Sequence, residues 1–186
     1  NITTLKEADD CVALVNWLRS QGVRVDGVGV HGHFGDSVDR NLLKGILDKL
    51  SVLNLPIWIT EYDSVTPDEY RRADNLENLY RTAFSHPSVE GIVMWGFWER
   101  VHWRGRDASI VNDNWTLNEA GRRFESLMNE WTTRAYGSTD GSGSFGFRGF
   151  YGTYRITVTV PGKGKYNYTL NLNRGSGTLQ TTYRIP

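Results

Sequence analysis

Two patterns of hydrophobic and polar residues alternate along the first two thirds of the chain. Apolar residues recur every three to four positions over four ranges: 5–21, 37–53, 66–85 and 117–133. This spacing marks the apolar face of an amphipathic helix. Short, almost continuously apolar runs fill three other ranges: 25–34, 55–63 and 89–98. Such runs are typical of strands buried on both faces, so the alternation predicts an α/β fold of parallel strands with crossover helices.

The pattern changes at Gly137. Residues 137–144 form a junction rich in glycine and serine, and residues 144–185 alternate aromatic or β-branched side chains with polar ones. Alternation predicts strands with one buried face, so we expect four or so antiparallel strands here. A unit of about 45 residues is close to the lower limit for independent folding. We therefore expect one domain over residues 1–136 and a small all-β, sandwich-like appendage over residues 137–186 that leans on it.

Composition and charge narrow the class of partner. The 186 residues include 21 Lys and Arg and 21 Asp and Glu, so no charge excess directs the chain to nucleic acid or to an anionic membrane. No stretch reaches the roughly 18 apolar residues of a membrane span. Seven Trp, nine Tyr and seven Phe offer flat faces that suit sugar rings. We expect a neutral partner, with no nucleic acid and no membrane.

Three Asn-x-Ser/Thr sequons, at Asn1, Asn114 and Asn167, match the acceptor pattern for N-glycosylation. They favour a secreted, extracellular glycoprotein that carries glycans at these positions. A single cysteine, Cys11, excludes a disulfide framework within the chain.

Two carboxylates stand at the end of the strand predicted over residues 55–63. Glu61 and Asp63 are two positions apart, so both side chains lie on one face of a strand. Parallel α/β barrels place catalytic groups at the carboxyl ends of their strands, which makes Glu61 a candidate nucleophile or base. The structural alternatives are a strand-end acid satisfied by an arginine or a helix N-terminus for Glu61, and a salt bridge for Asp63.

Three segments resemble one known family. Residues 60–63, Thr-Glu-Tyr-Asp, resemble the Thr-Glu-x-Asp nucleophile strand of family 10 glycoside hydrolases, the retaining endo-β-1,4-xylanases. Residues 29–34, Gly-Val-His-Gly-His-Phe, resemble the preceding strand of that family, which ends Gly-x-Gln-x-His. Residues 95–103 resemble its last strand and loop, Trp-Gly-x-x-Asp-x-x-Ser-Trp. The motifs follow the family's order, and the resemblance extends over residues 5–135.

The resemblance implies only part of a barrel. An eight-stranded barrel typically needs about 250 residues, whereas this pattern offers three strands. The matching part is the C-terminal half of a (β/α)8 TIM barrel, strands six to eight with helices five to eight. The family's acid/base glutamate follows an asparagine at the end of strand four, upstream of this segment. We expect the N-terminal half of the same barrel as a partner, either a separate or a missing chain.

The resemblance also implies roles for individual residues. Glu61 matches the catalytic nucleophile, and His33 matches the histidine that hydrogen-bonds it. Asp63 matches the acid that fixes the tautomer of this histidine from behind. Trp95 and Trp103 match the indoles that wall the sugar subsite next to the cleaved bond.

Three positions depart from the family pattern. His31 replaces the family glutamine, Glu99 replaces the aspartate after Trp95, and His102 replaces the serine before Trp103. We expect His31 and Glu99 to contact substrate in place of the family residues. An imidazole at position 31 donates its hydrogen bond from a different point than an amide, which would shift the pH profile or the sugar accepted.

Two classes of function follow. The first is a retaining endo-β-1,4-glycanase that hydrolyses xylan, or secondly a cellulose-like glucan, by double displacement. The second is a catalytically silent barrel that serves as a glycan-binding, structural or storage protein. His31 and His33 also raise the question of a metal site, since alternate residues share a strand face. With one cysteine and no third ligand in register, we expect no metal and no cofactor.

Overall fold

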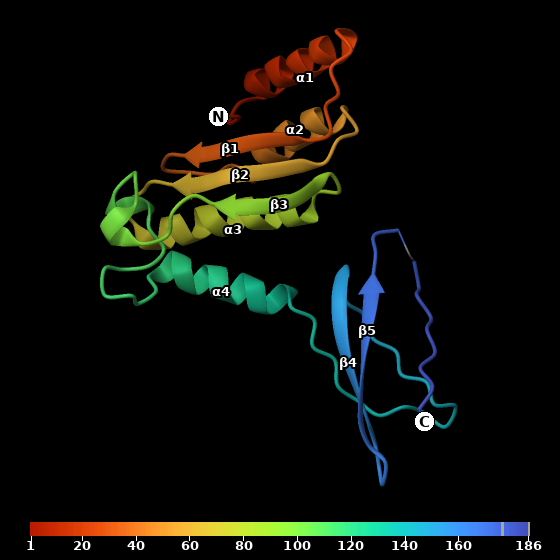
Figure 1. The fold of residues 1–186 in the computed structure, drawn as a ribbon. Helices are drawn as coiled ribbons and strands as arrows, with labels where there is room; N and C mark the ends of the chain where they lie inside the picture. The colour runs from red at the N-terminus through yellow and green to blue at the C-terminus, as the bar shows by residue number, and fades with distance from the viewer. Residues whose placement is uncertain (176, 186) are drawn as a thin grey trace. The chain divides into compact units, whose positions relative to one another are not determined.

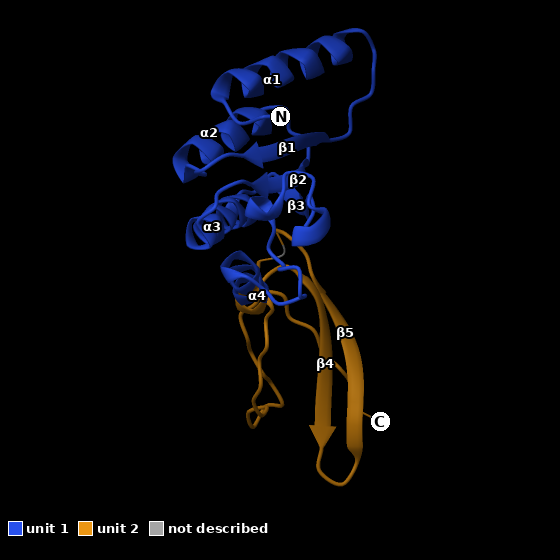
Figure 2. Ribbon diagram, turned by 90° about the vertical axis from the view of Figure 1, so that its left-hand side faces the viewer, with its two compact units in different colours: residues 1–128 blue, residues 129–186 orange. Residues whose placement is uncertain are grey.

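A computed structural model of the chain describes residues 1–175 and 177–185; Ser176 and Pro186 lie outside the described residues. The chain divides into two compact units, residues 1–128 and residues 129–186 (Figure 2). The predicted domain boundary after residue 136 lies C-terminal to this division.

The first unit is built on a parallel sheet of three strands in the order β1-β2-β3. The strands are β1 (Val28–Phe34), β2 (Ile57–Ser64) and β3 (Val89–Met94). Helix α2 (Arg40–Ser51) connects β1 to β2, and helix α3 (Glu69–Ser85) connects β2 to β3. The predicted parallel α/β arrangement is therefore present. All three strands point the same way, so their carboxyl ends meet at one edge of the sheet (Figure 1).

Acidic and hydroxyl side chains set the starts of three helices. Helix α1 (Leu5–Ser20) begins with a capping box between Thr4 and Glu7. Asp39 caps α2 and Asp68 caps α3, and each accepts two backbone N–H groups. Both helices therefore begin later than the predicted residues 37 and 66, because an aspartate further along satisfies the first free donors. Helix α4 (Glu119–Trp131) ends the βα pattern.

Helices α2 and α3 cover one face of the sheet (Figure 1). Their apolar stripes and the strands bury Val28, Val30, Leu43, Ile46, Leu47, Leu50, Ile57, Ile59, Leu76 and Leu79. Each such side chain contributes about 1.5–3 kcal/mol when fully buried. This layer holds the strand ends in place.

β2 contains one extra residue where it approaches the carboxyl edge. Val30 of β1 pairs with Ile59, but His31 pairs with Glu61, so the register skips Thr60. An extra residue of this kind forms a β-bulge and moves all later side chains to the opposite face. Ile59 is buried under the helices, whereas Glu61 turns to the face that carries His31.

The segment between β3 and α4 is a folded loop. It contains two short 3-10 helices, η1 (Glu99–Val101) and η2 (Arg106–Ala108). The loop is tied to β2, because Trp95 N–H donates to the Tyr62 carbonyl at 2.8 Å and Thr66 N–H donates to the Asp107 carbonyl at 3.0 Å. It therefore follows the carboxyl edge of the sheet.

The second unit contains an antiparallel hairpin of β4 (Gly152–Val160) and β5 (Gly164–Leu172). The prediction of four strands was wrong for the described residues: 145–150 and 179–183 form no strand. Gly146 and Gly149 interrupt the first of these segments, and glycine weakens strands. Side chains hold the second, since the Tyr183 ring lies 4.3 Å from the Tyr168 ring. A sandwich-like appendage stays a prediction.

Within the described residues, no helix combines the length and the apolar character that crossing a membrane requires.

Candidate active site

Glu61 stands between two histidines at the carboxyl ends of β1 and β2. Its carboxylate oxygens lie 2.8 Å from His33 Nε2 and 3.3 Å from His31 Nε2. The parallel register causes this, since it pairs His31 with Glu61 and His33 with Asp63. The Glu61 side chain is 17% exposed, so the carboxylate is accessible but held. Contacts with two imidazoles therefore fix the orientation of this carboxylate.

Asp63 lies behind His33 and receives three contacts. Its side chain is 1% exposed. One carboxylate oxygen lies 3.0 Å from His33 Nδ1 and accepts from Trp103 Nε1 at 2.9 Å. The other oxygen accepts from Arg104 Nη1 at 2.6 Å. A buried carboxylate needs such partners, because an unpaired charge is costly in the interior.

Asp63 therefore combines the two roles that the sequence left open. It forms a salt bridge with Arg104, and it contacts the far nitrogen of the histidine that touches Glu61. A carboxylate on Nδ1 fixes the orientation of an imidazole and the position of its proton. The contacts from Asp63 through His33 to Glu61 thus link a buried carboxylate to an accessible one.

Sequence reasoning missed Arg104. This residue also donates to the Phe34 carbonyl at 2.9 Å, so it joins the loop after β3 to the ends of β1 and β2. The sequence did carry a signal for Arg104. A buried aspartate needs a cation nearby, and Arg104 directly follows Trp103, a predicted site residue.

The two candidate tryptophans lie at the carboxyl edge in different settings. The Trp103 ring meets the His33 ring edge to face, with centroids 5.0 Å apart. Trp103 is 61% exposed while its indole N–H is bound to Asp63, which leaves a broad aromatic surface beside His33. Trp95 follows β3 directly and is 43% exposed. Both rings are accessible to a ligand.

Glu99 is engaged within the loop itself. Its carboxylate accepts from the Asp113 backbone N–H at 3.0 Å and lies 3.6 Å from Arg106 Nε. These contacts hold distant parts of the loop together and satisfy the Glu99 carboxylate. The structure therefore joins Glu61, Asp63, His31, His33 and Trp103 in one cluster, and it gives Glu99 a separate environment.

His102 is buried next to the cluster. Its ring packs against Gly96, whose φ of +86° and close approach leave no room for a Cβ. Burial lowers the pKa of the His102 imidazole, and the ring nitrogen Nδ1 accepts from the Arg104 N–H at 3.2 Å. His102 is thus a neutral packing residue that fixes the backbone before Trp103 and Arg104.

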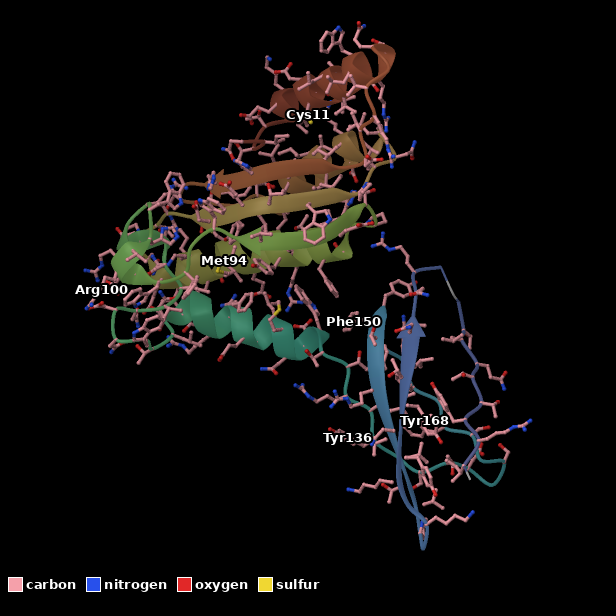
Figure 3. The ribbon with its side chains drawn as sticks, in the orientation of Figure 1. Cys11, Met94, Arg100, Tyr136, Phe150 and Tyr168 are labelled. Atoms are coloured by element: carbon pink, nitrogen blue, oxygen red, sulfur yellow. The ribbon has the colours of Figure 1, made fainter. Side chains whose placement is uncertain are left out.

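The loop also carries a stacked pair of tryptophans. Trp98 and Trp115 stack with centroids 4.4 Å apart, and the Arg100 guanidinium lies 5.4 Å from the centre of the Trp98 ring. Figure 3 shows Arg100 on the loop after β3. Its Nε pairs with the Asp113 carboxylate at 2.6 Å. These residues stabilise the loop that carries Trp103.

The expectation that His31 and His33 have no third metal ligand in register was wrong. His31, His33 and Glu61 each offer one ligand atom, and these atoms lie within 4.8 Å of one another. The third ligand was missed because it comes from the neighbouring strand, at the position that the bulge turns toward the histidines. A pattern search along a single strand does not detect it.

Comparison with known proteins connects this geometry to a family. Residues 1–125 match the family model described as Glycosyl hydrolase family 10. Endo-1,4-beta-xylanase 3 of Arabidopsis thaliana is 43% identical over 150 residues, which cover 81% of this chain and 20% of the relative. Endo-1,4-beta-xylanase 1 of the same plant is 41% identical over 158 residues, covering 84% of this chain and 16% of the relative. The chain thus spans a fifth or less of the length of these curated relatives.

Solved structures share the fold at lower identity. Xylanase 10B from Thermotoga petrophila, crystallised in complex with xylobiose, superposes with a TM-score of 0.59 and 19% identity over 66% of this chain and 42% of its own. Native xylanase 10B from Thermotoga maritima gives a TM-score of 0.57 and 22% identity over 63% of this chain and 41% of its own. With the family match over residues 1–125, these similarities lead to one conclusion: the chain belongs to glycosyl hydrolase family 10.

Proposed function

We propose that this chain supplies the nucleophile half of a retaining endo-β-1,4-xylanase. The observation that carries the proposal is the Glu61 carboxylate, accessible at the carboxyl edge and held between two imidazoles with Asp63 behind one of them. Family membership and the xylanase names of the relatives support this reading.

The proposed chemistry is double displacement at the anomeric carbon. Glu61 attacks this carbon and forms a covalent glycosyl-enzyme, which water then hydrolyses. A partner carboxylic acid about 5 Å away first protonates the leaving oxygen and later activates the water. We assign this acid to the N-terminal half of the barrel, outside this chain.

His33 and Asp63 act as positioning residues for the nucleophile. The contact between His33 Nε2 and Glu61 fixes the direction of the carboxylate, and the contact between Nδ1 and Asp63 fixes the ring. Trp103 and Trp95 supply exposed rings for the sugar next to the cleaved bond, and His31 supplies a polar contact to it.

The architecture supports assignment to the C-terminal half of the barrel, strands six to eight with helices five to eight. The three parallel strands leave a helix-free face that carries Trp58, Val93 and Trp95, all more than 40% exposed. We propose that the N-terminal half of the barrel covers this face and brings the acid. The substrate of the assembly is then a β-1,4-linked polysaccharide, with xylan preferred over a cellulose-like glucan.

We also propose that the protein is a secreted glycoprotein. Asn1, Asn114 and Asn167 are all exposed, as transfer of a glycan to each amide requires.

Glu99 supports the alternative of a silent, glycan-binding, structural or storage barrel. Its carboxylate binds the Asp113 N–H and Arg106 instead of joining the Glu61 cluster.

A mechanism-based label separates the two functions. The chain, assembled with the N-terminal half of the barrel, is incubated with a 2-fluoro xylobioside that traps a retaining nucleophile, and the labelled peptide is located by mass spectrometry. We expect one label on Glu61 and none on the Glu61→Gln variant. An assembly that takes up no label and hydrolyses no xylan would leave the silent barrel as the function.

A further inference from the structure

We propose that His31, His33 and Glu61 form a binding site for a divalent transition-metal ion of the Zn²⁺ type, and that this ion blocks the nucleophile. The binding site stands on its own geometry; the block on activity rests on the proposed function.

The donor set matches such an ion. Zn²⁺ is bound by imidazole nitrogen and carboxylate oxygen, and two histidines with one glutamate form a known three-ligand set that leaves a fourth position for water. The three ligand atoms lie within 4.8 Å of one another. A tetrahedral ion with bonds of about 2.0–2.1 Å separates its ligands by roughly 3.4 Å. The 3.3 Å between His31 Nε2 and Glu61 Oε1 already has this spacing, whereas the 2.8 Å between His33 Nε2 and Glu61 Oε2 has to lengthen for an ion to enter.

The residue behind the cluster prepares one ligand. Metal-bound histidines commonly donate their other N–H to a carboxylate, which fixes the ring and raises its basicity. Asp63 occupies that place, 3.0 Å from His33 Nδ1. An ion bound by His33 Nε2 and Glu61 would replace their direct contact, and any proton held between them would leave to solvent.

The site is accessible and preformed. The His31 side chain is 47% exposed, and Glu61 and His33 are partly exposed, so a hydrated ion reaches all three ligands. Strand pairing fixes the histidines on β1 and the glutamate on β2, so little ordering is needed on binding. His31 is the ligand that completes the set, because an amide at this position would leave one imidazole and one carboxylate.

A bound ion has a direct chemical consequence. It holds the lone pairs of Glu61 that would attack the anomeric carbon, so metal and substrate compete for one carboxylate. Inhibition should therefore weaken as the xylan concentration rises and disappear when a chelator is added.

The first experiment measures binding on the 186-residue chain without reference to activity. Co²⁺ is added as a spectroscopic probe, its visible absorption is followed, and Zn²⁺ is then added in competition; circular dichroism confirms that each variant is folded. We expect one bound Co²⁺ per chain. Even a residue that only supports a ligand contributes about 10- to 100-fold to metal affinity. His31→Gln should therefore weaken binding by about 100-fold or more.

Two control variants each remove one potential metal ligand outside the proposed site. Cys11→Ser removes the chain's one thiol, and His86→Gln removes an imidazole that contacts Asp48 instead of Glu61. Both should bind Co²⁺ as the unchanged chain does. Equal affinity of His31→Gln and the unchanged chain, or loss of binding in Cys11→Ser, would overturn the proposal.

A second experiment tests the block on the nucleophile. The rate of 2-fluoro xylobioside labelling is measured on the assembled barrel with and without Zn²⁺. Slower labelling in the unchanged protein, with little effect in His31→Gln, is the expected result. Bound Co²⁺ without any labelling would reject the proposed enzyme and keep the metal site, whereas labelling that Zn²⁺ leaves unaffected would reject the block.

Discussion

At the scale of single residues, the site is a series of charged and polar side chains that runs from the interior toward the surface. Arg104 neutralises Asp63, Asp63 holds His33, and His33 holds Glu61. Each contact restricts the movement of the next group, so the contact with His33 helps to fix the orientation of the Glu61 carboxylate. The direction of the Glu61 carboxylate therefore depends on a series of contacts that begins at Arg104, in the loop after β3.

His102 gives this region a pH-dependent stability. Burial lowers the pKa of its imidazole from the ordinary 6.5, so below pH 6.5 the unfolded chain takes up a proton at this position more readily than the folded chain. The stabilising contribution is complete above pH 6.5 and is lost as the pH falls toward the lowered pKa. One proton changes the free energy of unfolding by at most about 1.4 kcal/mol per pH unit.

The His102→Ser variant isolates this contribution. Urea unfolding of the unchanged chain and the variant between pH 7.5 and 5 should show a steeper loss of stability in the unchanged chain below about pH 6.5. Identical slopes for the two proteins would show that the buried imidazole does not titrate as its burial requires.

At the scale of elements, the bulge in β2 decides which face receives the carboxylates. Unbroken alternation would place Glu61 on the face of Ile57 and Ile59, which the helices bury. Skipping Thr60 turns Glu61 to the histidines instead. The geometry of the candidate site therefore depends on one extra residue in β2.

Deletion of Thr60 should undo this arrangement. Without the extra residue, either Glu61 is driven under the helices, where burying a charge costs several kcal/mol, or the strand pairing breaks. We expect a clearly lower urea midpoint than for the unchanged chain. Thr60→Ser keeps the residue count and should stay close to the unchanged chain. A deletion variant with an unchanged midpoint would show that the bulge is not required for register.

The sequence predicted the order of elements because long amphipathic helices and buried strands leave strong periodic signals. It also predicted the pairing of Glu61, His33 and Asp63 through the family resemblance, since these residues stand at fixed places in short motifs. It failed where contacts join segments far apart in the chain. Arg104 and the three-ligand arrangement arise from strand pairing and from the return of a loop, which no local pattern encodes.

The prediction of four strands in the second unit was wrong for a related reason. Residues 145–150 and 179–183 alternate correctly, but a strand also needs a partner for its backbone groups. Among the described residues of the second unit, only β4 and β5 form a strand pair. The flanking segments are held by ring contacts such as Tyr183 on Tyr168, which alternation does not distinguish from a ladder.

At the scale of the whole molecule, the sheet of the first unit has a covered face and an open one. Trp58 lies over Gly91, at a distance that excludes any Cβ on that glycine, and remains 45% exposed. Together with Val93 and Trp95 it forms an apolar surface on the side away from the helices. Exposed apolar surfaces of this kind mark interaction sites.

This open face leads to a testable prediction about assembly. The chain alone should bind the hydrophobic dye ANS, and supplying the N-terminal half of the barrel should reduce the dye fluorescence several-fold as the surface is covered. Trp58→Ser should lower dye binding by the chain alone, while Trp17→Ser, on an exposed turn of α1, should not. Dye fluorescence that is unaffected by the N-terminal half would place the partner elsewhere.

The contacts of Asp63 also set limits on protein engineering. Under the proposed function, exchange of the loop after β3 is a direct way to alter sugar preference, because this loop carries Trp103. The same loop brings Arg104, the cation of a carboxylate buried on another strand. A transplanted loop that lacks this pair would leave that carboxylate without two of its donors, so preference and stability would change together. Trp103 and Arg104 therefore have to be kept together in any chimera.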